Sequence, residues 1–232
     1  MADFSTIINR LAIVRDYFVD AINDKGGTAD DTMTFAQLAS QIYKIPTGME
    51  HVRNGYQLFK ENTTLTELPT SLDFRQFDSM YQMCYKCTSL TRVPQLETAN
   101  VTNMMWAFYG CSALTEIGGL DTSNIISASE MFHGCSALTA IYSTLDFSNV
   151  SSQIDTTFTS CKALVEVRFA GTINVDVAMN GCPKLSVDSL LSLLNALCEN
   201  AQGLTCKIGS TNLGKLTDEQ KAIALNKGWE LL

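Results

Sequence analysis

The sequence predicts an α/β solenoid, with a parallel sheet of short strands on one face and short helices on the other. Three observations lead to this prediction: a phrase recurs, its period is nearly constant, and its copies share apolar positions. The phrase reads Phe108-Tyr-Gly-Cys-Ser-Ala-Leu-Thr-Glu-Ile117 and returns 24 positions later as Phe132-His-Gly-Cys-Ser-Ala-Leu-Thr-Ala-Ile141. Periods of about 20 to 50 residues are typical of repeat architectures.

Looser copies extend the series in both directions. Their shared leucine recurs in steps of 25, 24, 24, 26 and 21 residues, at Leu65, Leu90, Leu114, Leu138, Leu164 and Leu185. Within a copy, Met104, Phe108 and Cys111 are spaced as on one face of a helix. The Leu-Thr-x-Ile portion indicates a short strand, and the Asx, Ser and Thr residues after it indicate a turn. Each repeat is therefore predicted to contain a strand, a turn and a short helix.

Residues 1–48 lie outside the repeat and predict a helical segment. Apolar residues spaced by three and four indicate a helix from Phe4 to about Asn23, which Lys25-Gly-Gly27 ends. A second helix is expected to begin at Thr34, which forms a capping box with Gln37. This segment is predicted to cover the open edge of the first repeat. Docking or oligomerisation through residues 1–46 is the alternative, and the two roles are compatible.

Residues 188–232 predict an α/β cap after the repeats of residues 49–187. Ser186 can cap a leucine-rich helix, and residues 204–208 alternate as in a strand. Thr217 and Gln220 form a second capping box, and residues 230–232 indicate a last strand. We expect this cap to continue the sheet and shield its edge.

Five of the eight cysteines occupy one repeat column: Cys87, Cys111, Cys135, Cys161 and Cys182. Equivalent residues on neighbouring parallel strands lie about 4.8 Å apart. Because free cysteine is a small and strongly buried residue, the column predicts a ladder of buried thiols in a reducing compartment. Disulfide bonds within the column and metal binding are the alternatives.

The charge of the chain restricts its partners. The net charge is −8, which argues against a nucleic-acid backbone and against an anionic membrane surface. The sequence has no run of about 18 apolar residues and no secretory signal near Met1. These features predict a protein of the cytoplasm or of a released phage particle, or of the cell surface if a signal has been removed.

The sequence offers no anchor for catalysis. His51 and His133 belong to no hydrolase or metalloprotease motif, and no glycine loop for a phosphate is present. Cys84 and Cys87 form the single CxxC, but Cys87 belongs to the thiol column and Cys84 replaces the phenylalanine of the repeat. We therefore expect a protein that is not an enzyme and that needs no cofactor or metal.

The segment Met131-Phe-His-Gly-Cys-Ser-Ala-Leu-Thr139, preceded by Leu120-Asp-Thr-Ser-Asn124, resembles the BspA-like leucine-rich repeats of bacterial surface and prophage-encoded proteins. The resemblance implies a curved leucine-rich-repeat solenoid that binds proteins or host surfaces without catalysis. The wall-sorting tail and lipobox of surface proteins are absent. The two ends of the chain are instead similar to those of repeat proteins encoded among phage tail genes.

Residues beside the conserved positions of the repeat are expected to point outward from the sheet. One column contains Glu67, Arg92, Glu116, Ala140 and Glu166, and the next contains Pro69, Pro94, Gly118, Tyr142 and Arg168. Solenoids bind partners through such a surface, and tyrosine and arginine are common at binding hot spots. The alternative is a solvated face without a partner.

The functional hypothesis is a non-enzymatic recognition or adhesion module. It would bind a protein or glycan on a cell surface through the sheet face, using Glu67, Arg92, Glu116, Tyr142, Glu166 and Arg168. The alternative hypothesis is a structural or host-contact component of a phage or prophage tail, attached through the N-terminal helices. Neither hypothesis involves nucleic acid or insertion into a membrane.

Overall fold

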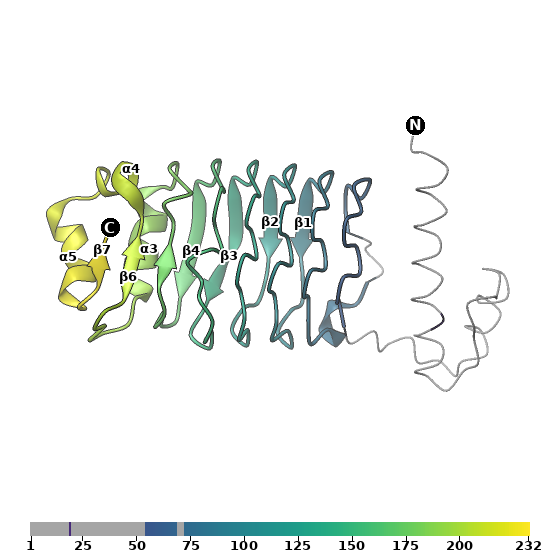
Figure 1. The fold of residues 1–232 in the computed structure, drawn as a ribbon, viewed down its shortest axis with the longest axis horizontal. Helices are drawn as coiled ribbons and strands as arrows, with labels where there is room; N and C mark the ends of the chain where they lie inside the picture. The colour runs from purple at the N-terminus through teal and green to yellow at the C-terminus, as the bar shows by residue number, and fades with distance from the viewer. Residues whose placement is uncertain (1–18, 20–53, 69–71) are drawn as a thin grey trace. The chain divides into compact units, whose positions relative to one another are not determined.

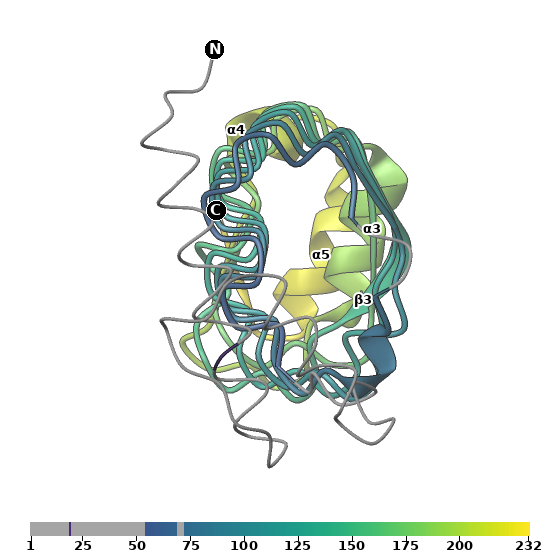
Figure 2. The same cartoon turned by 90° about the vertical axis from the view of Figure 1, so that its right-hand side faces the viewer.

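The computed structural model of the protein describes residues 19, 54–68 and 72–232. The repeats and the C-terminal segment belong to one compact unit, Arg53–Leu232, of mixed α/β structure with parallel strands. Figure 1 shows the repeats side by side in chain order, and Figure 2 looks along the row, where successive repeats follow nearly the same path. The structures and contacts predicted for residues 1–48 lie outside the described residues, apart from the helical Val19.

Four strands form one parallel sheet in the order of the chain: β1 (Arg92–Gln95), β2 (Glu116–Gly119), β3 (Ala140–Asp146) and β4 (Glu166–Ala170). Their register follows the repeat, because Val93 pairs with Ile117 and Ile117 pairs with Ile141. These apolar residues point into the core and are at most 2% exposed. The predicted strand is confirmed after the four shared leucines Leu90, Leu114, Leu138 and Leu164, and we call this part of each repeat the strand side.

A second parallel ladder joins the repeats at another part of their path. Single bridges connect Asn54 to Ser79, Ser79 to Asn103, and Asn103 to Ser127. Another bridge connects Ile154 to β5 (Val177–Ala178), which pairs with β6 (Thr205–Lys207), and β6 pairs with β7 (Glu230–Leu231). The C-terminal strands therefore form their own three-stranded sheet.

The short helices predicted within the repeats are wrong. Residues 80–87, 104–111, 128–135 and 154–161 form consecutive turns, which we call the turn side. Among the described residues before 187 that belong to the repeats, the one helical element is the 3-10 helix η2 (Phe74–Gln76). The N–H of Phe108 donates to the carbonyl of Met131 in the next repeat, at 2.9 Å. A helix would direct that N–H four residues back, to Met104.

The turn side imitates the spacing of a helix. Ala107 N donates to Met104 O and Cys111 N donates to Phe108 O, so two turns of four residues follow each other. They bury Met104, Ala107, Phe108 and Cys111, which is the spacing of one helical face. The third residue of each turn has a positive φ, as in a type II turn: 57° at Trp106 and 69° at Gly110.

The column of thiols is buried, as the repeat predicts. All five cysteines are 0% exposed, and each Sγ donates to a backbone carbonyl of the preceding repeat. Cys135 Sγ, for example, lies 3.1 Å from Phe108 O. Burial raises the pKa of Cys135 to about 12, because a thiolate is poorly solvated in the core. A cysteine side chain is small enough to fit in this part of the core, and its S–H group can donate to the carbonyl of the preceding repeat.

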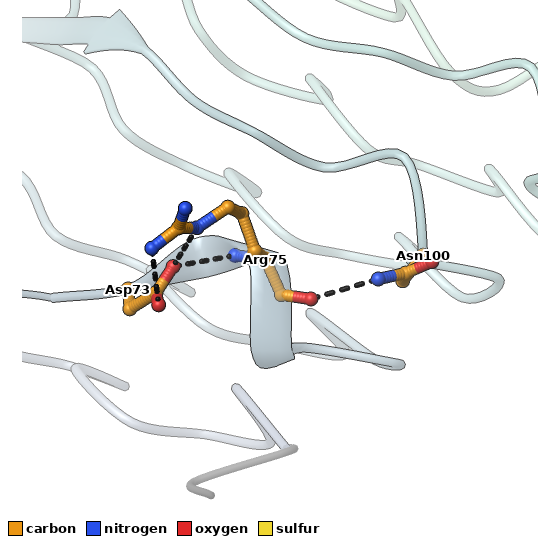
Figure 3. A network of polar contacts seen from close by, with 3 residues as sticks. All are labelled: Asp73, Arg75 and Asn100. Atoms are coloured by element: carbon orange, nitrogen blue, oxygen red, sulfur yellow. Dashed lines mark hydrogen bonds and ion pairs between the residues drawn. The ribbon is translucent and has the colours of Figure 1, made fainter. Parts of the chain in front are cut away.

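Asparagines join neighbouring repeats at the exposed corner after the strands. Asn100 Nδ2 donates to Arg75 O at 2.8 Å, Asn124 Nδ2 donates to Ala99 O at 2.8 Å, and Asn149 Nδ2 donates to Ser123 O at 2.6 Å. Figure 3 shows the first of these bonds, where Asp73 also accepts bonds from the backbone and guanidinium of Arg75. The guanidinium hydrogen bond lowers the pKa of Asp73.

The residues predicted to begin the C-terminal helices are confirmed. Ser186 caps α3 (Val187–Ala196), and the capping box of Thr217 and Gln220 begins α5 (Asp218–Asn226). Gly228 follows α5 with a φ of 86°, a conformation that glycine adopts without strain. The short helix α4 (Gly209–Leu213) was not expected. No helix among the described residues is both long and apolar enough to cross a membrane.

The C-terminal segment does not continue the β1–β4 sheet, contrary to the prediction. Helix α3 packs against β4, where another strand was expected. Ser189 Oγ accepts a bond from Val167 N at 3.1 Å, and Ser192 Oγ accepts one from Phe169 N at 3.2 Å. Serine hydroxyls on a helix thus satisfy strand N–H groups that a further strand would otherwise bind.

Candidate functional site

The first predicted column lies on the outward face of β1–β4, which we call the sheet face. Parallel pairing places its residues next to one another in the order Glu67, Arg92, Glu116, Ala140 and Glu166. Glu67, Arg92 and Glu166 are exposed and Glu116 is half-buried. Ala140 is only 6% exposed, because its methyl group lies between the longer side chains of Glu116 and Glu166.

The second predicted column is broken at β3. Arg168 pairs with Thr144 rather than with Tyr142, because the register shifts between Ala140 and Thr144. The cause is visible in the sequence, where the step from Leu138 to Leu164 is 26 residues instead of 24. A bulge of this kind redirects side chains, and Tyr142 is 65% exposed.

Polar contacts connect part of the sheet face. Arg92 Nε lies 2.7 Å from Glu116 Oε1, and the Tyr142 hydroxyl donates to Glu116 Oε2 at 3.3 Å. Glu116 therefore holds a cation and a phenol from the two strands beside its own. Arg168 is exposed on β4, while Pro69 lies outside the described residues. The structure thus brings together Arg92, Glu116 and Tyr142, with Glu67, Glu166 and Arg168 on the flanks.

Two rows of aromatic residues on the turn side escaped the sequence analysis. In the first row Tyr56 stacks on Tyr81 with ring centroids 5.1 Å apart, and Tyr81 makes a tilted contact with Trp106 at 5.5 Å. In the second row Tyr109 stacks on Tyr85 at 4.9 Å and on His133 at 4.7 Å. The signal was present in the sequence, because Tyr85, Tyr109 and His133 recur every 24 residues.

A cavity of about 130 Å³ lies between the two aromatic rows. Its lining is contributed by three successive repeats and consists of Gln82, Tyr85, Trp106, Tyr109 and Glu130. The Glu130 carboxylate lies 3.4 Å from His133 Nδ1, and Gln82 Oε1 accepts a bond from Gln57 Nε2 at 2.7 Å. Aromatic walls with a few converging polar groups are typical of binding sites.

Two larger hollows are more open. One of about 630 Å³ follows the asparagine corner and contains the exposed Ile126. Another, of about 540 Å³, lies where the repeats meet the C-terminal segment and contains Asp155, Lys162 and Lys207. In the part of the chain that the structure describes, no group of three or more His, Cys, Asp or Glu side chains could hold a metal ion.

The buried CxxC is part of the core. Cys84 and Cys87 are both 0% exposed, and burial raises the pKa of Cys84. The pKa of Cys87 is lowered by its hydrogen bond with Cys84. The Sγ of Cys87 also donates to Phe59 O at 2.9 Å. Both side chains thus pack inside the repeats, away from the sheet face and from the surface cavity.

One family model matches the repeat portion of the chain. It covers residues 53–168, half of the chain, and its description is "Mycoplasma protein of unknown function, DUF285". Neither a curated protein nor a solved structure matches the chain. The matched range contains strands β1, β2 and β3, the whole turn side and the aromatic rows.

Proposed function

This chain belongs to the DUF285 family, and from this premise we propose that its repeats form a BspA-like leucine-rich-repeat solenoid that acts as a recognition module. The module binds a protein or glycan of a cell surface through the sheet face. It acts by binding alone, without a catalytic step, cofactor or metal.

Two ladders support the proposal of a solenoid. The strand side joins β1 to β4 in parallel, and single parallel bridges join the repeats again near residues 54, 79, 103 and 127. In both ladders the paired residues are about one repeat apart in the chain. Repetition of the same step at two places in each repeat is what a solenoid requires.

The observation that carries the binding proposal is the bulged Tyr142 beside charged neighbours. Its ring is 65% exposed, although tyrosine buries a large area when it binds. The bulge in β3 directs Tyr142 out of the regular sheet, and bulges often occur where a strand presents a functional side chain. Tyrosine and arginine are the residue types that dominate binding energy at interfaces.

The charges of the sheet face favour a polar partner. Glu67 and Glu166 are exposed at the two ends of the column, and Arg168 is exposed on β4. Exposed charges of this kind orient a partner and contribute little to fold stability. The partner is therefore expected to contact Tyr142 at the centre and to match alternating charges around it.

The test uses the double variant Tyr142→Ala with Arg168→Ala. Fluorescently labelled full-length protein is added to bacterial and animal cells, and cell-bound label is measured by flow cytometry. The proposal expects saturable binding that the double variant lowers by at least about tenfold, since truncating a hot-spot residue costs about 2 kcal/mol or more and about 1.4 kcal/mol is a factor of ten.

A matched variant controls for unspecific effects. Ile126→Ala with Lys162→Ala also removes one exposed apolar side chain and one exposed cation, but both positions lie off the sheet face. This control is expected to bind like the unchanged protein. Equal binding by both double variants would contradict the proposed site, and no saturable binding to any cell would contradict the proposed function.

A further inference from the structure

We propose that the cavity beside Trp106 on the turn side binds one pyranose ring of a neutral glycan. This inference concerns a surface other than the sheet face and does not depend on the function proposed there. The cavity measures about 130 Å³, whereas pockets for drug-sized ligands measure about 300–1,000 Å³. It can therefore admit a single small ring but not a folded peptide segment.

Trp106 offers this ring a free aromatic surface. The other rings of the two rows are stacked: Tyr56 on Tyr81, and Tyr85, Tyr109 and His133 on one another. Trp106 makes one ring contact among the described residues, to Tyr81, and the two planes are inclined by 54°. The equivalent position in the next repeat is Glu130, so no further ring stacks on the indole from that direction.

The backbone holds the lining residues in an unfavourable conformation. Gln82, Trp106 and Glu130 have φ values of 53°, 57° and 52°, and all three line the cavity. A left-handed backbone costs most residues roughly 1–2 kcal/mol relative to the right-handed form. Glycine avoids this cost and occurs at Gly110 and Gly134 in the other positive-φ column, where Lys86 and Ser160 also have a positive φ. The positive φ is therefore a property of the repeat, and it sets the positions of the three side chains that line the cavity.

A ligand in the cavity would meet both donors and acceptors of hydrogen bonds. The indole N–H of Trp106 and the hydroxyls of Tyr85 and Tyr109 make no hydrogen bond within the described residues. Glu130 adds an acceptor, and the Gln82 amide adds both kinds of group. Hydroxyl groups meet both demands, and a pyranose also has apolar C–H groups that can pack on an indole.

The local charges are of both signs and favour neither an anionic nor a cationic ligand. The ammonium groups of Lys60 and Lys86 lie 5.6 and 5.2 Å from the Tyr85 ring centroid, so they already make cation–π contacts there. The Glu130 carboxylate adds a negative charge, so for a ligand of either charge the attraction to one of these groups is offset by repulsion from the other. A neutral, hydroxyl-rich ring satisfies the size, the free indole, the hydrogen-bonding groups and the charges together.

The experiment titrates full-length protein with neutral tetrasaccharides of glucose, mannose, galactose and N-acetylglucosamine, up to about 10 mM, within the range of weak affinities. Tryptophan fluorescence follows binding, and saturation-transfer NMR identifies the sugar protons that touch the protein. At least one sugar is expected to give a saturable signal from ring protons. Failure of all four sugars would overturn the proposal.

The decisive variant is Trp106→Gly. Glycine suits the positive φ, so the variant is expected to stay folded while its sugar affinity falls by about tenfold or more. Saturation-transfer NMR measures this affinity, because the change removes the tryptophan whose fluorescence reports binding. Glu130→Gln preserves shape and is expected to weaken binding less. Ile126→Ala is the control: it removes an exposed side chain that neither lines this cavity nor lies on the sheet face, and it should leave sugar affinity unchanged. Sugar binding that survives Trp106→Gly, or displacement of the sugar by a proline-rich peptide or choline with higher affinity, would contradict the proposal.

Discussion

The strand side and the turn side of each repeat stack in the same direction but use their backbones differently. On the strand side, β1 to β4 form a regular parallel sheet with a register of one repeat. On the turn side, alternate N–H groups bind the next repeat, as Met104 N binds Ser127 O at 2.9 Å. The N–H groups between them close local turns, as Ala107 N does to Met104 O at 3.1 Å.

This difference explains where each kind of surface arises. A regular sheet presents flat columns of side chains, and the charged column from Glu67 to Glu166 is the result. Consecutive turns with positive φ place neighbouring side chains in two close rows, and the aromatic rows are the result. A single repeat phrase thus produces two chemically distinct faces.

The largest expected change in the free energy of unfolding tests whether buried residues of the turn side stabilise the protein as much as those of the strand side. Phe132 is 0% exposed and its ring lies between Phe108 and Phe158, with centroids 5.9 and 5.5 Å away. Phe132→Ala is expected to lower the free energy of unfolding by about 3–5 kcal/mol, because it leaves a cavity. Leu138→Ala, at the entry to β3, is the strand-side counterpart, with an expected loss of about 2–5 kcal/mol. Urea denaturation measures both, and a loss under about 1 kcal/mol for either would remove that residue from the core.

A smaller change in stability, that of Gly134→Ala, has opposite signs in a turn and in a helix. Gly134 has a φ of 75°, and an added Cβ would meet only ordinary contacts with Gly110. Gly134→Ala is therefore expected to destabilise the protein by about 1–2 kcal/mol, through the backbone conformation alone. In a helix the same change would stabilise by about 1 kcal/mol. Ser160→Gly, in the same column with a φ of 63°, is the control and should not lose stability.

The thiol column predicts a pH dependence. The folded pKa of Cys135 is about 12, above the ordinary value of 9.0, because burial disfavours the thiolate. The unfolded thiol therefore ionises first, and the free energy of unfolding should fall as the pH rises from about 9 toward about 12. Urea midpoints measured across this range test the prediction. Cys135→Ala should show a shallower fall than the unchanged protein, and an identical slope would contradict it.

The smallest effect is expected on the sheet face. The side chain of Arg92 is 64% exposed in its ion pair with Glu116. Arg92→Ala is expected to change the free energy of unfolding by less than about 1 kcal/mol, since exposed ion pairs contribute little. Urea denaturation beside Leu138→Ala measures the contrast. A larger loss would mean that the charged column stabilises the sheet rather than remaining free for a partner.

Periodicity predicted much of the strand side and of the C-terminal helices. The Leu-Thr-x-Ile motif gave the strands, and the side chains of Ser186 and Thr217 gave the helix starts, because each signal has one structural meaning. The bulge at Tyr142 follows from two extra residues in one repeat. The longer step between Leu138 and Leu164 could therefore have predicted that Tyr142 does not pair with Arg168.

The turn side could not be predicted from apolar spacing alone. Met104, Ala107, Phe108 and Cys111 have the spacing of a helical face, but two successive turns bury the same positions. A helix and two successive turns differ in the acceptors of their backbone N–H groups, and the spacing of apolar side chains does not show which acceptors are used. The glycines at Gly110 and Gly134 were a useful signal, because a glycine repeated at one column indicates a positive φ.

The most direct test of this contrast is an NMR measurement of scalar couplings across hydrogen bonds in perdeuterated protein. The structure predicts a coupling from the amide nitrogen of Phe108 to the carbonyl carbon of Met131, and from Gly110 to His133. Observing both would establish that the turn side binds repeat to repeat. A coupling from Phe108 to Met104 instead would mean that the segment is a helix and would contradict the stacking of turns.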